Sequence, residues 1–240
     1  MMVLSASMEN RTARRVVVAI DGPAGAGKST VARRLAARLG FTYIDTGAMY
    51  RAVALWALRQ GVDPSDAYRV ESLARAASIR FAPGGSGVEL NGEDVTEAIR
   101  TPEVAAAASQ VATCAGVRST LVAKQRAMAE TASVVMEGRD IGSVVFPDAE
   151  VKVFLDAGEQ ERIRRRLAES APALADPGAA QAVAEQIRER DLRDRGRRES
   201  PLVQAPDAVY LDTTGLTIEQ VEEAILKIVR ERLTNGKGLS

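Results

Sequence analysis

The sequence contains no histidine, a single cysteine and few aromatic residues. Without histidine it lacks the commonest general base, the catalytic triads that use imidazole, and most zinc or iron sites. The lone Cys114 cannot form an internal disulfide, so we expect the protein to work in a reducing cytoplasm. Any chemistry must proceed without imidazole.

Net charge and long apolar runs are also missing. The 32 basic and 32 acidic side chains cancel, so no global positive field predicts binding to nucleic acid or to an anionic membrane. No stretch approaches the roughly 20 apolar residues of a membrane span. Residues 1–13 are polar and lack the apolar region of a secretion signal, so we expect a flexible tail, with Met8 as an alternative start. No repeat or exposed apolar stripe is visible, and a monomer is the expected state.

With 240 residues and 46% hydrophobic content, the chain can build a buried core. Residues 15–21 form a β-branched run, followed by a Gly-rich loop and a segment with an apolar face formed by Val31, Leu35 and Leu39. Residues 41–45 and 47–60 then read as a strand and a helix. This succession predicts a βαβ unit and a parallel sheet.

The remaining chain shows five further features. Residues 62–100 resemble short strands around a Gly-rich turn and predict an inserted subdomain. Pro102 suits the start of a long helical stretch that is interrupted near Gly116. Three further strands are expected, at SVVMEG, AEVKVFLDA and AVYLDTT. Residues 159–199 predict a charged, hinged helical arm, and residues 218–233 a closing amphipathic helix.

The loop GPAGAGKS satisfies the pattern G-x-x-x-x-G-K-[ST] between a strand and a helix, which is its required context. Glycines let the backbone turn its N–H groups around an anion, and the helix N-terminus favours negative charge. Lys28 is expected on the β- and γ-phosphates of ATP, and the Ser29 hydroxyl on Mg²⁺, the expected cofactor. The predicted ATP-binding residues are Gly22, Pro23, Ala24, Gly25, Ala26, Gly27, Lys28, Ser29 and Thr30. A bare structural turn and a nucleotide-binding module without phosphate transfer are the alternatives.

A GTPase switch is disfavoured, because none of the three asparagines, Asn10, Asn91 and Asn235, lies in an N-K-x-D guanine motif. The segments GPAGAGKST, DTGAMYRA, VVMEGRDIGSVVFPDA, VKVFLDA and IRERDLRDRGRR together resemble bacterial cytidylate kinases, over about residues 16–233. The first motif is shared by many ATPases, whereas EGRDIGSVVFPDA is far more particular to this family.

The resemblance implies the α/β fold of P-loop nucleoside monophosphate kinases: a five-stranded parallel sheet flanked by helices, an acceptor-binding insert with a small antiparallel sheet, and a helical lid. We place the core at about residues 14–45, 103–158 and 200–235, the acceptor-binding subdomain at 46–102, and the lid and arginine-rich arm at 159–199, in one unit spanning 14–240. The implied activity is transfer of the terminal phosphate of ATP to CMP or dCMP.

The resemblance also assigns the acceptor site. The implied acceptor-binding residues are Thr46, Arg51, Ser109, Arg118, Arg139, Asp140, Arg190, Asp194 and Arg197. Asp140 and Arg118 would read cytosine, because a carboxylate accepts from its amino group and an arginine donates to its ring acceptors. Uracil offers a carbonyl in place of that amino group, so UMP should bind worse.

The implied catalytic residues are Lys28, Arg139, Arg166 and Arg197. Arg162, Arg165 and Arg166 fall where the family's lid supplies cations over the donor phosphates, although each could equally lie on a solvated face. Without the resemblance, IRERDLRDRGRR is most economically a helix of i, i+4 ion pairs such as Arg190 with Asp194. The rival functions are a related kinase for AMP, UMP or shikimate, and an ATP-gated binding protein.

Overall fold

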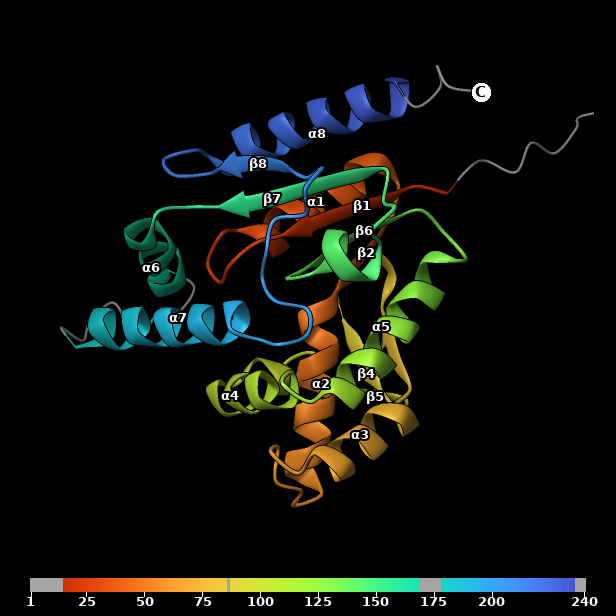
Figure 1. Ribbon diagram of the computed structural model, residues 1–240, viewed down its shortest axis with the longest axis vertical. Coiled ribbons are helices and arrows are strands. Elements are labelled where there is room, and N and C mark those ends of the chain that lie inside the picture. Colours follow the sequence, from red (N-terminus) through yellow and green to blue (C-terminus); the bar gives the residue numbers. More distant parts are fainter. Residues whose placement is uncertain (1–14, 86, 169–177, 236–240) are drawn as a thin grey trace, which may run out of the picture.

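A computed structural model describes residues 15–85, 87–168 and 178–235. The predicted N-terminal tail at 1–13 lies outside the described residues, as do residues 169–177 of the predicted arm and the last residues, 236–240. The predicted α/β fold is confirmed. A five-stranded sheet forms the centre of the molecule, and a separate three-stranded sheet lies apart from it (Figure 1).

The large sheet has the strand order β2-β6-β1-β7-β8 and is parallel throughout. Its strands are β1 (Val17–Asp21), β2 (Thr42–Asp45), β6 (Val134–Gly138), β7 (Val151–Asp156) and β8 (Val209–Asp212). The three inner strands are covered on both faces and accordingly read as apolar runs.

Helices cover both faces of this sheet. On one face α1 (Lys28–Leu39) and α8 (Ile218–Asn235) share a hydrophobic cluster with the strands. Helix α1 ends at Gly40, whose φ of 68° is left-handed and whose N–H reaches the last carbonyls of the helix. On the other face, a cluster around Met136 and Ile141 packs against the end of α5 (Ala115–Ala129).

A third cluster of buried residues holds together the predicted insert, which lies below the sheet in Figure 1. Its elements are α2 (Thr46–Arg59), α3 (Ala67–Ala76), β3 (Ile79–Phe81), β4 (Val88–Leu90), β5 (Glu93–Asp94) and α4 (Pro102–Val111). The three short strands are antiparallel, as predicted. The cluster continues to Leu121 in α5, beyond the boundary that we placed at residue 102.

The predicted long helix after residue 101 is two helices. Pro102 occupies the first turn of α4, where the Thr101 hydroxyl accepts a hydrogen bond from the N–H of Val104 at 3.3 Å. The break lies at residues 112–114, and Gly116 is already inside the first turn of α5.

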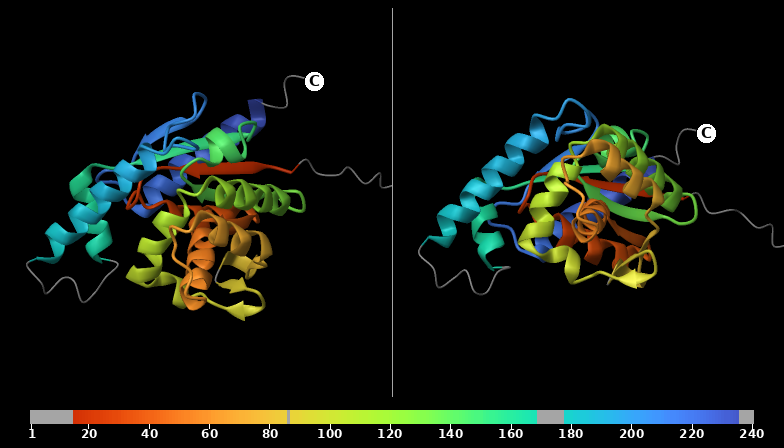
Figure 2. Two further views of the ribbon diagram at one scale, coloured as in Figure 1. Left: turned by 60° about the horizontal axis from the view of Figure 1, so that its bottom comes forward. Right: turned by 90° about the horizontal axis from the view of Figure 1, so that it is seen from below.

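The predicted helical arm is formed by α6 (Glu159–Ala168) and α7 (Ala179–Arg195), which share a small apolar cluster of their own. Figure 2 shows both helices on one side of the molecule, away from α3 and the antiparallel sheet. They lie beyond the carboxyl end of β7, next to the Gly-rich loop (Figure 1).

Candidate functional site

The carboxyl ends of the five parallel strands meet at one edge of the sheet, where open α/β sheets bind their ligands. The strand register pairs Asp21 with Gly138, and Asp45 with Glu137. The segments that leave these strands are the Gly-rich loop, the start of α2, and the loop that contains Arg139 and Asp140. The topology thereby brings the predicted donor and acceptor motifs to one place.

The Gly-rich loop has the backbone conformation that an anion cradle needs. Gly25 and Gly27 have φ values of 77° and 86°, which favour glycine. Gly27 caps α1 without any side-chain hydrogen bond, so the first N–H groups of this helix remain available to a phosphate. Lys28 is buried, and its Nζ donates to the carbonyl of Pro23 at 2.7 Å.

Two of the three predicted lid arginines hold the backbone of this loop. Arg162 Nη1 donates to the carbonyl of Ala24 at 3.1 Å and to Asp191 Oδ2 at 2.6 Å. Arg165 Nη1 donates to the carbonyl of Ala26 at 3.3 Å and to the Thr213 hydroxyl at 2.9 Å. Both guanidinium groups therefore fix the loop carbonyls from the α6 side.

Oxygen atoms gather beside Lys28 and Ser29. The Tyr43 hydroxyl donates to Glu137 Oε1 at 2.6 Å, and Ser29 also forms a hydrogen bond with the Glu137 carboxylate. Burial raises the pKa of Glu137, and the nearby Asp45 carboxylate raises it further. A divalent cation would relieve this repulsion, and hydroxyl and carboxylate oxygens are the ligands that Mg²⁺ prefers. In the described part of the chain, no three carboxylates or thiols form a metal site by themselves.

Arg118 and Asp140, predicted to read a base, form a buried ion pair between Nη2 and Oδ2. Arg118 is only 4% exposed, and Asp140 only 7%. The Arg118 guanidinium also lies over the Tyr50 ring at 5.6 Å, while its Nε has no hydrogen-bond partner in the described structure. An unsatisfied buried donor next to a carboxylate is suited to a planar polar ligand.

Three other predicted acceptor residues have partners within the protein. The Thr46 hydroxyl donates to the carbonyl of Glu137 at 2.7 Å, and Arg51 Nη2 donates to Asp45 Oδ2 at 2.7 Å. Ser109 Oγ accepts from Arg193 Nη1 at 2.7 Å. Arg193 was absent from our predicted site, since nothing in the sequence links α7 to α4.

Asp194 is the centre of the remaining predicted group. It is 1% exposed and accepts from Arg139 Nε at 2.8 Å and from Arg197 Nη2. Arg190 Nε lies 4.0 Å from the same carboxylate. The nearby arginines lower the pKa of Asp194 against the effect of burial, so this carboxylate is ionised and orders the cations around it.

Five cations from different parts of the chain interact electrostatically: Lys28, Arg51, Arg139, Arg166 and Arg190. Burial, together with the charges of Arg139 and Arg190, lowers the pKa of Lys28 to about 7. Burial likewise lowers the pKa of Arg190 to about 10, with contributions from Arg139, Arg51 and Arg166. The positive charges that lower the pKa of Lys28 and of Arg190 would favour a polyanion bound beside these two groups.

The structure thus places the predicted residues described above near the carboxyl end of the sheet and adds several that the sequence did not single out. The added residues are Asp21, Tyr43, Asp45, Asp191 and Arg193. All of these except Asp45 act through a partner far away in the sequence, so no local motif identifies them. Asp45 pairs with Arg51 within the segment DTGAMYRA. Only the acidic end of a strand before a Gly-rich loop could have drawn attention to Asp21.

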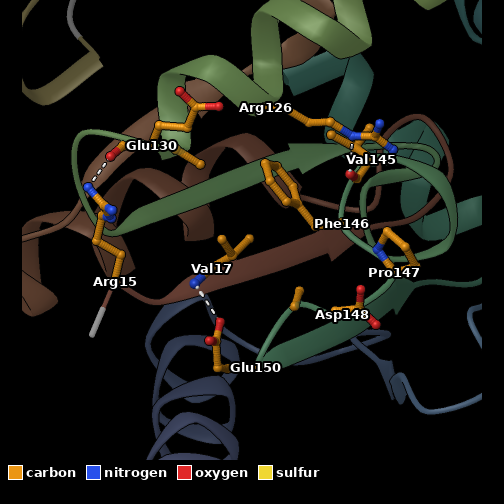
Figure 3. Close-up of a pocket in the computed structure, with 11 residues that line it drawn as sticks. Arg15, Val17, Arg126, Glu130, Val145, Phe146, Pro147, Asp148 and Glu150 are labelled. Atoms are coloured by element: carbon orange, nitrogen blue, oxygen red, sulfur yellow. Dashed lines mark hydrogen bonds between the residues drawn. The ribbon is translucent and has the colours of Figure 1, made fainter.

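Two cavities accompany this arrangement. A cavity of about 880 Å³ is lined by Arg118, Arg193 and Arg197. Another, of about 520 Å³, lies at the opposite edge of the sheet, between Val17 and Phe146 (Figure 3). There Glu150 accepts from the N–H of Val17 at 3.0 Å, and no predicted site residue lines the cavity.

Comparison with known proteins gives consistent matches along the chain. A family model described as "Cytidylate kinase" matches residues 18–231. A "Cytidylate kinase" from Solibacter usitatus (strain Ellin6076) is 62% identical over 234 residues, which cover 97% of this chain and 100% of that relative. A "Cytidylate kinase" from Geobacillus kaustophilus (strain HTA426) is 51% identical over 222 residues, covering 92% and 99%. None of the helices in the described ranges is long and apolar enough to cross a membrane.

Proposed function

Because the chain belongs to the cytidylate kinase family, we propose that it transfers the terminal phosphate of ATP to CMP or dCMP, giving ADP and CDP or dCDP. The observation that carries this proposal is the buried Arg118–Asp140 pair beside the cation-lined phosphate loop. A phosphate donor site and a reader of a polar base edge lie at the same end of one sheet.

On the donor side, we propose that residues 22–30 bind the ATP phosphates, with Lys28 on the β- and γ-phosphates. The left-handed glycines and the uncapped start of α1 support this role. When ATP binds, Lys28 would leave the Pro23 carbonyl and bind phosphate oxygens as an ammonium. Arg139, Arg166 and Arg197 would stabilise the charge that spreads over the transferred group.

Magnesium fits this half of the site. Ser29 would hold it through its hydroxyl, next to the Glu137 carboxylate, and the phosphates of ATP would complete the oxygen ligands. The ion would supply neutralisation of the phosphate charge. The acceptor phosphate is already anionic near pH 7, so the transfer needs no general base, in agreement with a sequence that has no histidine.

On the acceptor side, we propose that Asp140 accepts from the cytosine amino group and that Arg118 and Ser109 donate to the ring acceptors. Thr46 would contact the acceptor nucleotide, and Arg51 its phosphate. Asp194 and Arg190 would lie near the sugar hydroxyls. We propose that the protein acts as a monomer in the cytoplasm, since the residues named above form both halves of the site within one chain.

The test is an ADP-release assay with Mg-ATP and, in turn, CMP, dCMP, UMP, AMP, shikimate or no acceptor. We expect turnover with CMP and dCMP well above that with the others. Turnover with a different acceptor would identify a related kinase and refute the proposal. ATP binding without turnover on any acceptor would instead identify a nucleotide-gated binding protein.

Asp140→Asn tests the base reading itself. The amide keeps the shape and can still accept from Arg118, but it presents an N–H donor that suits the uracil carbonyl. We expect the preference for CMP over UMP, as a ratio of kcat/KM, to fall about 10-fold to 100-fold. Asp148→Asn, an exposed carboxylate at the far cavity, is the control and should leave the ratio unchanged. An unchanged ratio in Asp140→Asn would remove this residue from base recognition.

A further inference from the structure

Asp21 joins the donor loop to the acceptor-reading segment. It is the last residue of β1, directly before Gly22, and it is only 5% exposed. Its Oδ1 accepts from the N–H of Ile141 at 2.8 Å, and its Oδ2 accepts from the N–H of Gly142 at 2.7 Å. Both carboxylate oxygens are thus used on the two peptide groups that follow Asp140.

These two peptide groups begin a short π-helix, Ile141–Val145, whose first N–H groups have no partners within the helix. The residue at the capping position is Asp140, yet its side chain makes no capping hydrogen bond. It is paired with Arg118 instead. Asp21, on the neighbouring strand β1, provides the capping hydrogen bonds that Asp140 does not make, so the Asp140 carboxylate can pair with Arg118.

The surrounding packing fixes this connection. Asp21 is the register partner of Gly138 on β6 and of Phe154 on β7, so its backbone is held between two strands. A Cβ atom on Gly142 would lie 3.2 Å from Lys152 Cδ and 3.4 Å from Asp21 Oδ2. The carboxylate and the turn therefore have little room to move apart. Burial raises the pKa of Asp21 to about 6, against the effect of the two N–H groups, so the group is ionised above neutral pH.

We propose that Asp21 is a positioning residue for acceptor recognition: by capping the π-helix through Ile141 and Gly142, it holds Arg139 and Asp140 in the orientation that reads the acceptor. This inference rests on the proposed function, because it names a further determinant of the same site. Asp21 touches no substrate. Its effect reaches the acceptor through the backbone of residues 138–142.

The test is Asp21→Asn, assayed with CMP and UMP at saturating Mg-ATP, and with ATP at saturating CMP. An asparagine has one carbonyl oxygen for two N–H donors, so one charge-assisted bond becomes a contact between two donors. We expect KM for CMP to rise about 10-fold to 100-fold, and the CMP preference over UMP to narrow, while KM for ATP changes less than about 2-fold.

Asp63→Asn is the matched control, because Asp63 also accepts two hydrogen bonds, from the N–H and the hydroxyl of Ser65, but on an exposed loop. It should change neither KM. The proposal is overturned if Asp21→Asn folds and leaves KM for CMP unchanged, or if KM for ATP rises as much as KM for CMP. Failure of the wild-type protein to phosphorylate CMP would refute the proposed function separately.

A second variant applies if Asp21→Asn does not fold. Gly142→Ala adds a methyl group against Lys152 and Asp21 and so disturbs the same contact from the other side. Raised KM for CMP with unchanged KM for ATP supports the positioning role. Unchanged KM values for both substrates in the folded variant overturn it.

Discussion

Gly22 and Gly116 offer a direct test of how the sheet fixes the phosphate loop. Gly22 has a φ of 148°, a conformation that residues with a side chain rarely adopt. A Cβ atom there would lie 1.9 Å from the backbone oxygen of Leu155 in β7. That oxygen belongs to the middle of the sheet and cannot move without separating β1 from β7.

The magnitude for Gly22→Ala follows from two effects. The unfavourable backbone conformation costs about 1–3 kcal/mol. Overpacking in a closely packed core costs about 1–3 kcal/mol more. We therefore expect the free energy of unfolding to fall by about 2–6 kcal/mol, measured as a lower urea midpoint with an unchanged slope.

Gly116→Ala is the control, because its Cβ would lie even closer to another atom, 1.8 Å from Glu71 Oε2. That atom is the end of a flexible side chain that can rotate away. The rotation would break the ion pair of Glu71 with the mostly exposed Arg75, which contributes up to about 0.5 kcal/mol. Alanine in the first turn of α5 gains up to about 1 kcal/mol of helix propensity. We expect stability within about 1 kcal/mol of wild type. If Gly116→Ala were the more destabilising of the two, the reasoning would be refuted.

Two further predictions concern nucleotide binding. The pKa of Lys28, lowered to about 7, means that the free enzyme loses this ammonium as pH rises through 7, whereas bound phosphate would restore it. Kd for ATP should therefore rise about tenfold per pH unit between pH 7.5 and 9. Calorimetry in two buffers of different ionisation enthalpy should show that binding takes up a proton. A Kd that does not change with pH in this range would contradict the prediction. Arg193→Gln should raise KM for CMP about 3-fold to 10-fold with little change in kcat. The Arg193 guanidinium can only donate to Ser109 Oγ, so the hydroxyl proton of Ser109 remains free to bond to the cytosine base. The exposed Arg195→Gln is its control, and equal KM values in steady-state assays would exclude this role.

The phosphate loop and its flanking elements could be predicted from the sequence because their determinants are local. The motif occupies adjacent positions, and the helix that follows carries its own apolar face and its own stop at Gly40. The two helices after residue 101 show the limit of this approach. The sequence predicts an interruption near Gly116, while the chain breaks a few residues earlier, between the end of α4 and the start of α5.

The contacts that organise the site could not be predicted, because they join distant segments. The i, i+4 pattern pairs Asp194 with Arg190, yet Asp194 makes a shorter bond to Arg139 at the end of β6. The link from Asp21 to Ile141 depends on the register of β1 with β6, which the sequence does not reveal.

The hydrogen bonds from α6 to the carbonyls of the Gly-rich loop reduce the entropy cost of ATP binding. Arg162 and Arg165 bind the carbonyls of Ala24 and Ala26 through contacts made entirely within the protein. Ordering the backbone of one residue costs about 1–2 kcal/mol, and here that cost falls on folding and not on association. ATP therefore meets a preorganised cradle, and more of its interaction energy remains as affinity.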